Sequence, residues 1–166
     1  MPNQRISELN DFLPSICARY ERVEPEIQEE IQMHTFSDID NNGMKCPAIS
    51  LSDGTIKMIA LLAAILKRNH STAVIEEPEN YVHPWACQAL VDYLRSRFDS
   101  STCILTTHSE TILNCATPRE IIIINNATGF TSGQRLKNIA SVQKAIRVSG
   151  FGCGYHYMTG GLGGMP

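Results

Sequence analysis

The 166-residue sequence has no long hydrophobic run. Its longest apolar segment extends only from Met58 to Leu66, far short of the roughly 20 residues that a helix needs to cross a bilayer. The first residues, MPNQRISELNDF, also lack the apolar stretch of a secretory signal. We therefore expect a cytoplasmic protein with no membrane partner.

An excess of positive charge is absent as well. The formal net charge is -3, so no overall positive field attracts nucleic acid. A local basic helix face remains possible, although a solvated surface is the favoured reading. Its members would be Arg135, Lys137, Lys144 and Arg147.

The six cysteines form no CxxC pair. Cys153 and His156 are three residues apart, but no second pair completes a zinc site. Several cysteines lie inside apolar segments, such as Cys103 in TCILTTH. This usage is typical of reduced thiols in a cytosolic protein.

Helical and β-strand patterns alternate along the chain. An amphipathic helix over 4–13 would be ended or bent by Pro14, whereas 21–35 has no clear pattern. From residue 48 onward the alternation predicts an α/β layered fold with parallel strands and crossover helices. The expected elements are helix 56–67, strand 73–76, a helix opening at His83-Pro84, strand 103–106, a short helix 109–113, strand 121–124 and helix 135–147.

Three regions follow from these patterns. Residues 1–47 are a lead-in, 48–149 form the core, and 150–166 are a loop-like tail with seven glycines that is either flexible or packed by close backbone approach. The helix after Pro84 is expected to bury one apolar face. That face comprises Trp85, Ala89, Leu90, Tyr93 and Leu94.

Three motifs lie at the ends of these elements. Leu51-Ser52-Asp53-Gly54-Thr55 opens a helix, where backbone N–H groups and the helix dipole favour an anion and glycine permits close approach. Glu76 and Glu77 end a strand, where one acid can hold magnesium and the other can orient water. His108 follows the next strand. Ligands of open parallel sheets bind at this carboxyl edge.

These motifs resemble those of ABC-type ATPase heads. LSDGT resembles the signature motif, AVIEEPEN a Walker B strand with its catalytic glutamate, and NYVHP the D-loop, while THS carries the switch histidine. The sequence pattern EEPEN..HP followed by THSE most resembles the bacterial ATPases of the overcoming-lysogenisation-defect type. These are related to SMC and RecF heads and are often called AAA-family ATPases. The resemblance implies a P-loop NTPase-like fold, with ATP and Mg²⁺ as ligands.

The resemblance also implies roles for individual residues. Glu77 would be the general base or the residue that orients water, and His108 would contact the γ-phosphate, while Glu76 would help to hold Mg²⁺. Many relatives carry aspartate in place of Glu76. The signature residues Ser52, Asp53, Gly54 and Thr55 would bind ATP held by a partner subunit, and Asn80 and His83 would lie at the subunit interface.

The Walker A motif is missing from this sequence. A P-loop requires G-x-x-x-x-G-K-[ST], and the sequence contains no Gly-Lys dipeptide. We therefore expect the C-terminal half of an ATPase, either a fragment or a split-gene product. Its P-loop would come from a missing N-terminal portion or from a second polypeptide. The active form would be a homo-dimer or a pair with a P-loop-bearing partner chain, and a nuclease or DNA-linked partner would receive its output.

Other interpretations remain open. A truncated head could act as a non-catalytic regulatory or dimerisation module on a full-length ATPase, and a decayed fragment could have no function. Asp38, Asp40, Asn42 and Gly43 match the first half of a calcium loop, but Ile49 stands where a bidentate glutamate is required. A tight turn is the simpler reading of those four residues.

Overall fold

The computed structural model describes residues 2–17, 19–28, 31–38, 42–66, 71–127 and 129–163. It divides into two compact units. The first unit comprises Met1–Ile75 and Asn80–Ile104, and the second comprises Glu76–Glu79 and Leu105–Pro166. Among the described residues, no helix has the length and apolar character to span a bilayer. Of the four residues of the calcium alternative, Asp40 lies outside the described part of the chain, whereas Asn42 and Gly43 lie in a turn.

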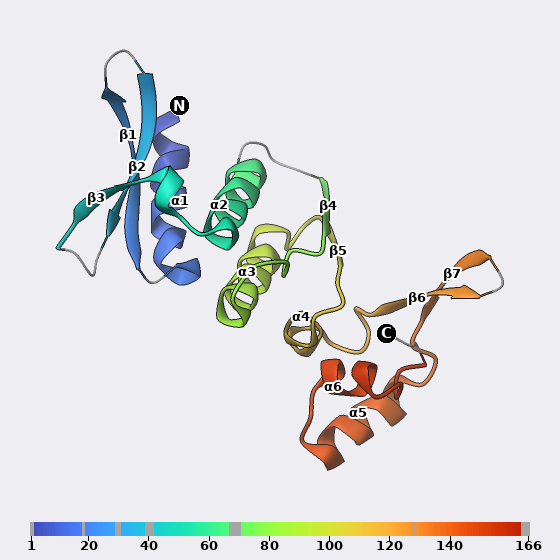
Figure 1. Cartoon of the computed structure of the whole chain (residues 1–166). Helices are drawn as coiled ribbons and strands as arrows, with labels where there is room; N and C mark the ends of the chain where they lie inside the picture. Colours follow the sequence, from blue (N-terminus) through green and yellow to red (C-terminus); the bar gives the residue numbers. More distant parts are fainter. Residues whose placement is uncertain are drawn as a thin grey trace. The chain divides into compact units, whose positions relative to one another are not determined.

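The first unit begins with helix α1 (Pro2–Ile16), which packs against an antiparallel sheet of order β1-β2-β3 (Figure 1). The Asn10 side chain connects the two because it accepts a hydrogen bond from the Val23 N–H at 2.8 Å and donates to the Val23 carbonyl at 3.2 Å. The stretch 21–35, which had no assignable pattern, is therefore a hairpin. The strands are β1 (Tyr20–Gln28), β2 (Ile31–Asp38) and β3 (Met44–Pro47).

Helix α1 continues through Pro14 to Ile16, so the alternative in which Pro14 ends the helix is wrong. Proline removes one helical hydrogen bond, but the Cys17 N–H still donates to the Leu13 carbonyl at 2.9 Å. Leu13 and Ile16 are both buried. Burial of these side chains on either side of the proline outweighs the lost bond.

Helix α2 (Asp53–Leu66) follows the short 3-10 helix η1 (Ala48–Ser50). Ser52 caps α2, because its Oγ accepts a hydrogen bond from the Thr55 N–H at 3.3 Å. Gly54 lies in the first turn and is buried. A Cβ atom built on Gly54 would collide with the carbonyl oxygen of Tyr81, so the helix can approach that turn only with glycine at this position.

Helix α3 (Pro84–Arg97) begins where the sequence predicts. The imidazole of His83 accepts a hydrogen bond from the Trp85 N–H at 3.2 Å, and Pro84 occupies the first helical position. The expected burial of Trp85 is wrong, since 45% of this residue is exposed. Trp85 lies off the buried face, which comprises Ala86, Cys87, Leu90, Val91 and Leu94.

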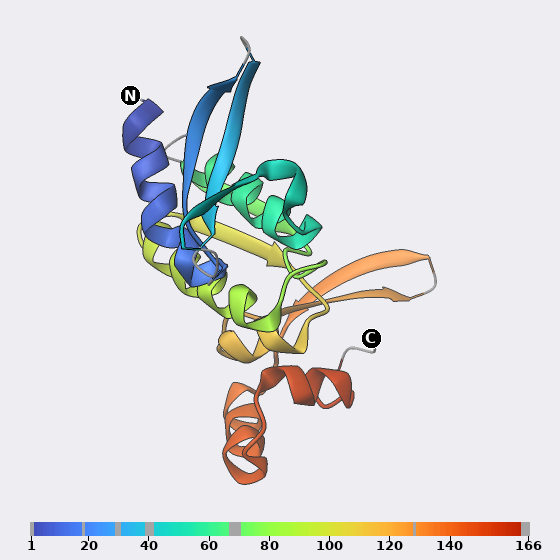
Figure 2. The same ribbon diagram turned by 60° about the vertical axis from the view of Figure 1, so that its left-hand side comes forward.

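Strands β4 (Thr72–Glu76) and β5 (Thr102–Thr106) form a two-stranded sheet, with α3 as the crossover between them (Figure 2). The strands are parallel: the Thr102 N–H donates to the Ser71 carbonyl at 3.1 Å, and the Glu77 N–H donates to the Thr106 carbonyl at 2.9 Å. Pairing that advances in the same direction along both strands is the parallel pattern. The predicted α/β fold class is confirmed.

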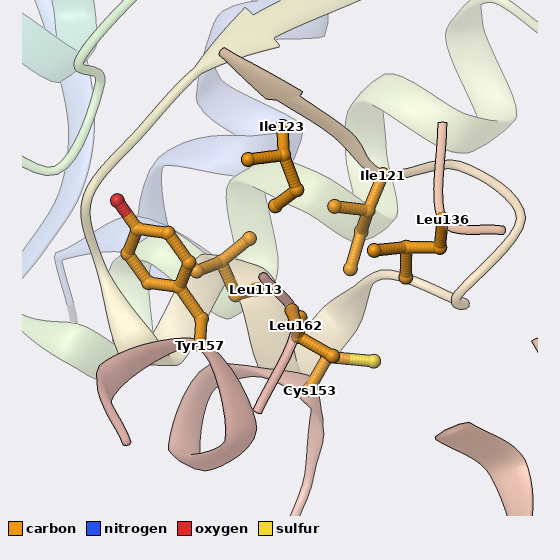
Figure 3. Packing of buried hydrophobic residues seen from close by; sticks show 7 residues of the cluster. All are labelled: Leu113, Ile121, Ile123, Leu136, Cys153, Tyr157 and Leu162. Atoms are coloured by element: carbon orange, nitrogen blue, oxygen red, sulfur yellow. The ribbon is translucent and has the colours of Figure 1, made fainter. Parts of the chain in front are cut away.

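The second unit has its own core (Figure 3). Helix α6 (Cys153–Met158) contributes Cys153 and Tyr157 to it, so the tail expected to be loop-like contains a packed helix. The strand expected at 121–124 is β6 (Ile122–Ala127), which pairs antiparallel with β7 (Phe130–Arg135) and not as a further parallel strand. The other elements are α4 (Glu110–Cys115) and α5 (Ile139–Ser149). The buried cluster comprises Leu113, Ile121, Ile123, Leu136, Cys153, Tyr157 and Leu162.

Glycine permits the close packing of α6. A Cβ atom on Gly154 would collide with the backbone of Glu110, and one on Gly152 would collide with the side chain of Asn114. The Gly154 N–H donates to Asn114 Oδ1 at 2.8 Å. The tail glycines at 152 and 154 therefore serve close backbone approach to α4, which was one of the two readings of this segment.

We expect Gly54→Ala to lower the free energy of unfolding by about 2 kcal/mol, because the added methyl group overpacks the contact with the Tyr81 carbonyl. Chemical denaturation measures the change. The exposed Ile56 on the same helix gives the control, and Ile56→Ala should change stability by less than about 0.5 kcal/mol. A Gly54→Ala chain as stable as the wild type would contradict this account.

We expect the thiol of Cys153 to react slowly in the folded chain. Only 3% of this residue is exposed, and burial raises the pKa of its thiol above the ordinary value, which keeps it protonated at pH 8. Alkylation followed by peptide mass spectrometry should give a rate at least about tenfold below that in denaturant. Equal rates in the two conditions would mean that α6 is not packed in the core.

Candidate functional site

A hydrogen bond from Glu77 connects the carboxyl ends of β4 and β5. The Glu77 N–H donates to the Thr106 carbonyl at 2.9 Å and lies 3.3 Å from Thr106 Oγ1. Glu77 has a φ of 39°, a left-handed conformation that costs a non-glycine residue roughly 1–2 kcal/mol. Backbone strain of this kind is concentrated at functional sites. The turn carries the predicted base directly beside the start of the loop that contains His108.

Glu76 is the last residue of β4, and its side chain is exposed. A carboxylate is the kind of hard oxygen ligand that magnesium takes. The described part of the chain contains no group of three or more histidine, cysteine, aspartate or glutamate side chains that could hold a metal ion. Glu76 therefore offers one carboxylate at the end of β4, without a cluster of further metal-ligating side chains in the part of the chain that the structure describes.

Glu79 anchors the loop after β5. Its Oε1 atom accepts hydrogen bonds from the Thr107 hydroxyl at 2.6 Å, the His108 N–H at 3.0 Å and the Ser109 N–H at 3.2 Å. Bonds to an ionised carboxylate are roughly twice as strong as neutral ones. Glu79 follows Glu76 and Glu77 closely in the sequence, and its contacts place it at the loop that carries His108.

The ring of His108 contacts a residue that the sequence did not single out. Its Nδ1 atom lies 3.2 Å from the hydroxyl oxygen of Tyr157, on α6. Tyr157 belongs to the buried cluster of the second unit, and in Figure 3 its hydroxyl points away from the other labelled side chains. Nothing in the spacing of 49 residues signals this pair, because it depends on the packing of α6.

The signature segment lies in the first unit. Ser52 Oγ and Thr55 Oγ1 are 2.9 Å apart, so these hydroxyls bond to each other at the start of α2. Gly54 packs against Tyr81, and the Asn80 carbonyl accepts a hydrogen bond from Lys57 Nζ at 3.4 Å. The LSDGT segment at the start of α2 is thus in direct contact with residues 80–81, in the loop that precedes α3.

The predicted site residues consequently fall into two groups. The second unit contains Glu76, Glu77 and His108, together with the additional residues Thr106 and Glu79. The first unit contains the signature residues and the expected interface pair. These are Ser52, Asp53, Gly54, Thr55, Asn80 and His83.

Cys103 lies on β5, three residues before Thr106, and burial raises the pKa of its thiol. A raised thiol pKa reduces the thiolate that would act as a nucleophile.

A curated relative, the Retron Vc95 probable ATPase of Vibrio cholerae serotype O1 biovar El Tor, is 29% identical over 105 residues. The match covers 55% of this chain and 20% of the relative, so the chain spans about a fifth of that protein's length. The name of this relative indicates that the chain is related in sequence to an ATPase. The match leaves most of that protein's length uncovered.

Solved SMC structures share the fold. A chain from work on ATP-driven dimerisation and DNA-stimulated activation of SMC ATPases has a TM-score of 0.68 at 8% identity, covering 89% of this chain and 92% of the other. The SMC head domain from Thermotoga maritima has a TM-score of 0.57 at 13% identity, covering 81% and 48%. The fold is therefore that of SMC-type ATPase heads.

A family model described as "AAA domain, putative AbiEii toxin, Type IV TA system" matches residues 4–114. This match includes the signature segment, both strand-end acids and the loop with His108, which are the residues that the geometry singles out. The chain belongs to this family of AAA ATPase domains.

Proposed function

We propose that this chain supplies the hydrolytic half of an ATP-hydrolysing site and requires a P-loop from elsewhere. The observation that carries the proposal is the bond between Glu77 and Thr106, which holds an acid beside the loop of His108 at the carboxyl ends of two parallel strands. Ligands of parallel sheets bind at this edge. Family membership supports ATP as the ligand.

In the proposed reaction, the Glu77 carboxylate orients a water molecule and accepts its proton. The water oxygen attacks the γ-phosphorus of ATP, the bond from this phosphorus to the bridging oxygen breaks, and ADP leaves. His108 donates a hydrogen bond to a γ-phosphate oxygen. Bound magnesium would neutralise charge that develops on the phosphate oxygens, and Glu76 would help to hold it.

The signature segment would act on nucleotide held by a partner subunit. Ser52, Asp53, Gly54 and Thr55 occupy the start of a 14-residue helix, whose dipole favours an anion. Asn80 and His83 would lie at the subunit interface. The SMC study with the same fold concerns ATP-driven dimerisation. It supports a nucleotide-sandwiched dimer, formed either by two copies that are each completed by a P-loop portion or by this chain and a P-loop-bearing partner.

One face of the β4–β5 sheet supports the need for a partner. Val74 is 68% exposed and Ile104 is 49% exposed, although they lie on neighbouring parallel strands. Parallel sheets are normally covered on both faces. The segment that brings the P-loop, whether an N-terminal portion or a second polypeptide, would also cover these side chains. A nuclease or DNA-linked protein would then receive the conformational change.

We expect the purified chain to bind ATP weakly, without saturation below about 1 mM, because P-loop backbone and lysine contacts normally hold the β- and γ-phosphates. Calorimetric titration with Mg-ATP measures the affinity. Titration of the mixture with the P-loop-bearing partner provides the comparison. A micromolar dissociation constant for the chain alone would overturn the requirement for a P-loop in trans.

We expect phosphate release only in a mixture of this chain with the polypeptide encoded beside it, and a fall of at least about a hundredfold with Glu77→Gln. Glu21→Gln makes the same chemical change on β1, outside the motifs, and should leave turnover unchanged. Turnover that persists with Glu77→Gln would favour the alternative of a regulatory or dimerisation module that acts on a complete ATPase.

A further inference from the structure

Two contacts hold the switch histidine. The backbone of residues 107–109 is fixed by Glu79, whose Oε1 atom accepts three hydrogen bonds from that loop. The Thr107 hydroxyl also accepts a hydrogen bond from the Ser109 N–H at 2.9 Å. The loop is therefore tied to one carboxylate oxygen through its backbone and through the hydroxyl of Thr107.

The second contact fixes the ring. Tyr157 is only 9% exposed, and its aromatic body packs in the cluster with Leu113 and Ile123 (Figure 3). A ring held in a packed core has little rotational freedom. Its hydroxyl, 3.2 Å from His108 Nδ1, is consequently a fixed point against which an exposed imidazole is oriented.

The identity of the contacting nitrogen decides what the other nitrogen can do. In a neutral imidazole one ring nitrogen donates and the other accepts. If the Tyr157 hydroxyl donates to Nδ1, the proton of His108 is on Nε2, which can then donate to a phosphate oxygen. The opposite tautomer would present a bare nitrogen lone pair to an anion, which is repulsive.

We propose that Tyr157 and Glu79 are positioning residues for His108: Tyr157 holds the imidazole in the tautomer protonated on Nε2, and Glu79 holds the backbone that carries it. The ring state of His108 is a property of this chain by itself. Its consequence for ATP turnover rests on the proposed function, in which Nε2–H contacts the γ-phosphate.

The tautomer can be measured without nucleotide. The full chain is labelled with ¹⁵N-histidine, His108 is assigned from the signal lost in His108→Gln, and long-range ¹H–¹⁵N correlations are recorded at pH 8.5. We expect the wild-type His108 ring to be almost entirely protonated on Nε2. In Tyr157→Phe, which keeps the packed ring and removes only the hydroxyl, the two tautomers should mix.

Tyr155→Phe is the matched control. Tyr155 lies on the same helix but stacks on Phe151, with ring centroids 4.3 Å apart. Its loss of a hydroxyl should leave the His108 signals unchanged, and thermal melting should show that both variants stay folded. A His108 tautomer ratio that is the same in wild type and Tyr157→Phe would overturn the assignment of Tyr157.

Glu79 is tested by amide hydrogen exchange. Glu79→Gln keeps the size of the side chain but removes the charge that accepts the N–H groups of His108 and Ser109. We expect exchange at these two amides to rise by about tenfold, with little change at buried amides of α3. Unchanged exchange at both amides would overturn the role of Glu79.

ATP turnover in the mixture with the P-loop-bearing partner tests whether the tautomer of His108 affects catalysis. We expect Tyr157→Phe to lower kcat by about tenfold while the KM for ATP changes by less than about twofold. Tyr155→Phe should match the wild type. If the wild-type mixture hydrolyses no ATP, the proposed function fails, and the nitrogen spectra still decide whether Tyr157 positions His108.

Discussion

The parallel pairing of β4 with β5 is the constraint on which the site depends. The last bond of this ladder, from the Glu77 N–H to the Thr106 carbonyl, is made as the chain turns out of β4 with a positive φ at Glu77. That bond fixes where the acid leaves the sheet and where the loop of His108 begins. Two strands cannot form a stable sheet alone, so α3 and the packing around it support this edge.

Several residues expected at the nucleotide or at the subunit interface already have structural partners in the chain itself. Ser52 caps α2, Gly54 allows contact with the Tyr81 carbonyl, and His83 caps α3. Each role explains its residue type without any ligand. A motif residue can therefore be required for folding and for binding together, and loss of activity on substitution of Gly54 would not by itself distinguish the two. Variants that keep the backbone contacts, such as Glu77→Gln, separate them better.

The sequence predicted those elements whose signals are local. Strand β4 is an unbroken β-forming run bounded by acids and a proline, and α3 begins at a histidine and proline that suit a helix start. The β1–β2 hairpin was missed because charged residues and Pro25 obscure its alternation, and because Asn10 from α1 supplies part of its hydrogen bonding. Helix α6 was missed because a glycine-rich segment ordinarily indicates a loop. Gly154 is in a helix because the backbone of Glu110 occupies the space that a Cβ atom would need.

The same distinction between local and tertiary information applies inside the site. Glu76, Glu77 and His108 follow recognisable strands, whereas the partner of His108 comes from a helix 49 residues further along. Glu79 shows the intermediate case, since its position beside the acids is visible in the sequence but its three bonds to residues 107–109 are not. Its other oxygen, Oε2, is buried without a hydrogen-bond partner among the described residues. The contribution of Glu79 to the loop of His108 therefore comes from Oε1 and its three hydrogen bonds.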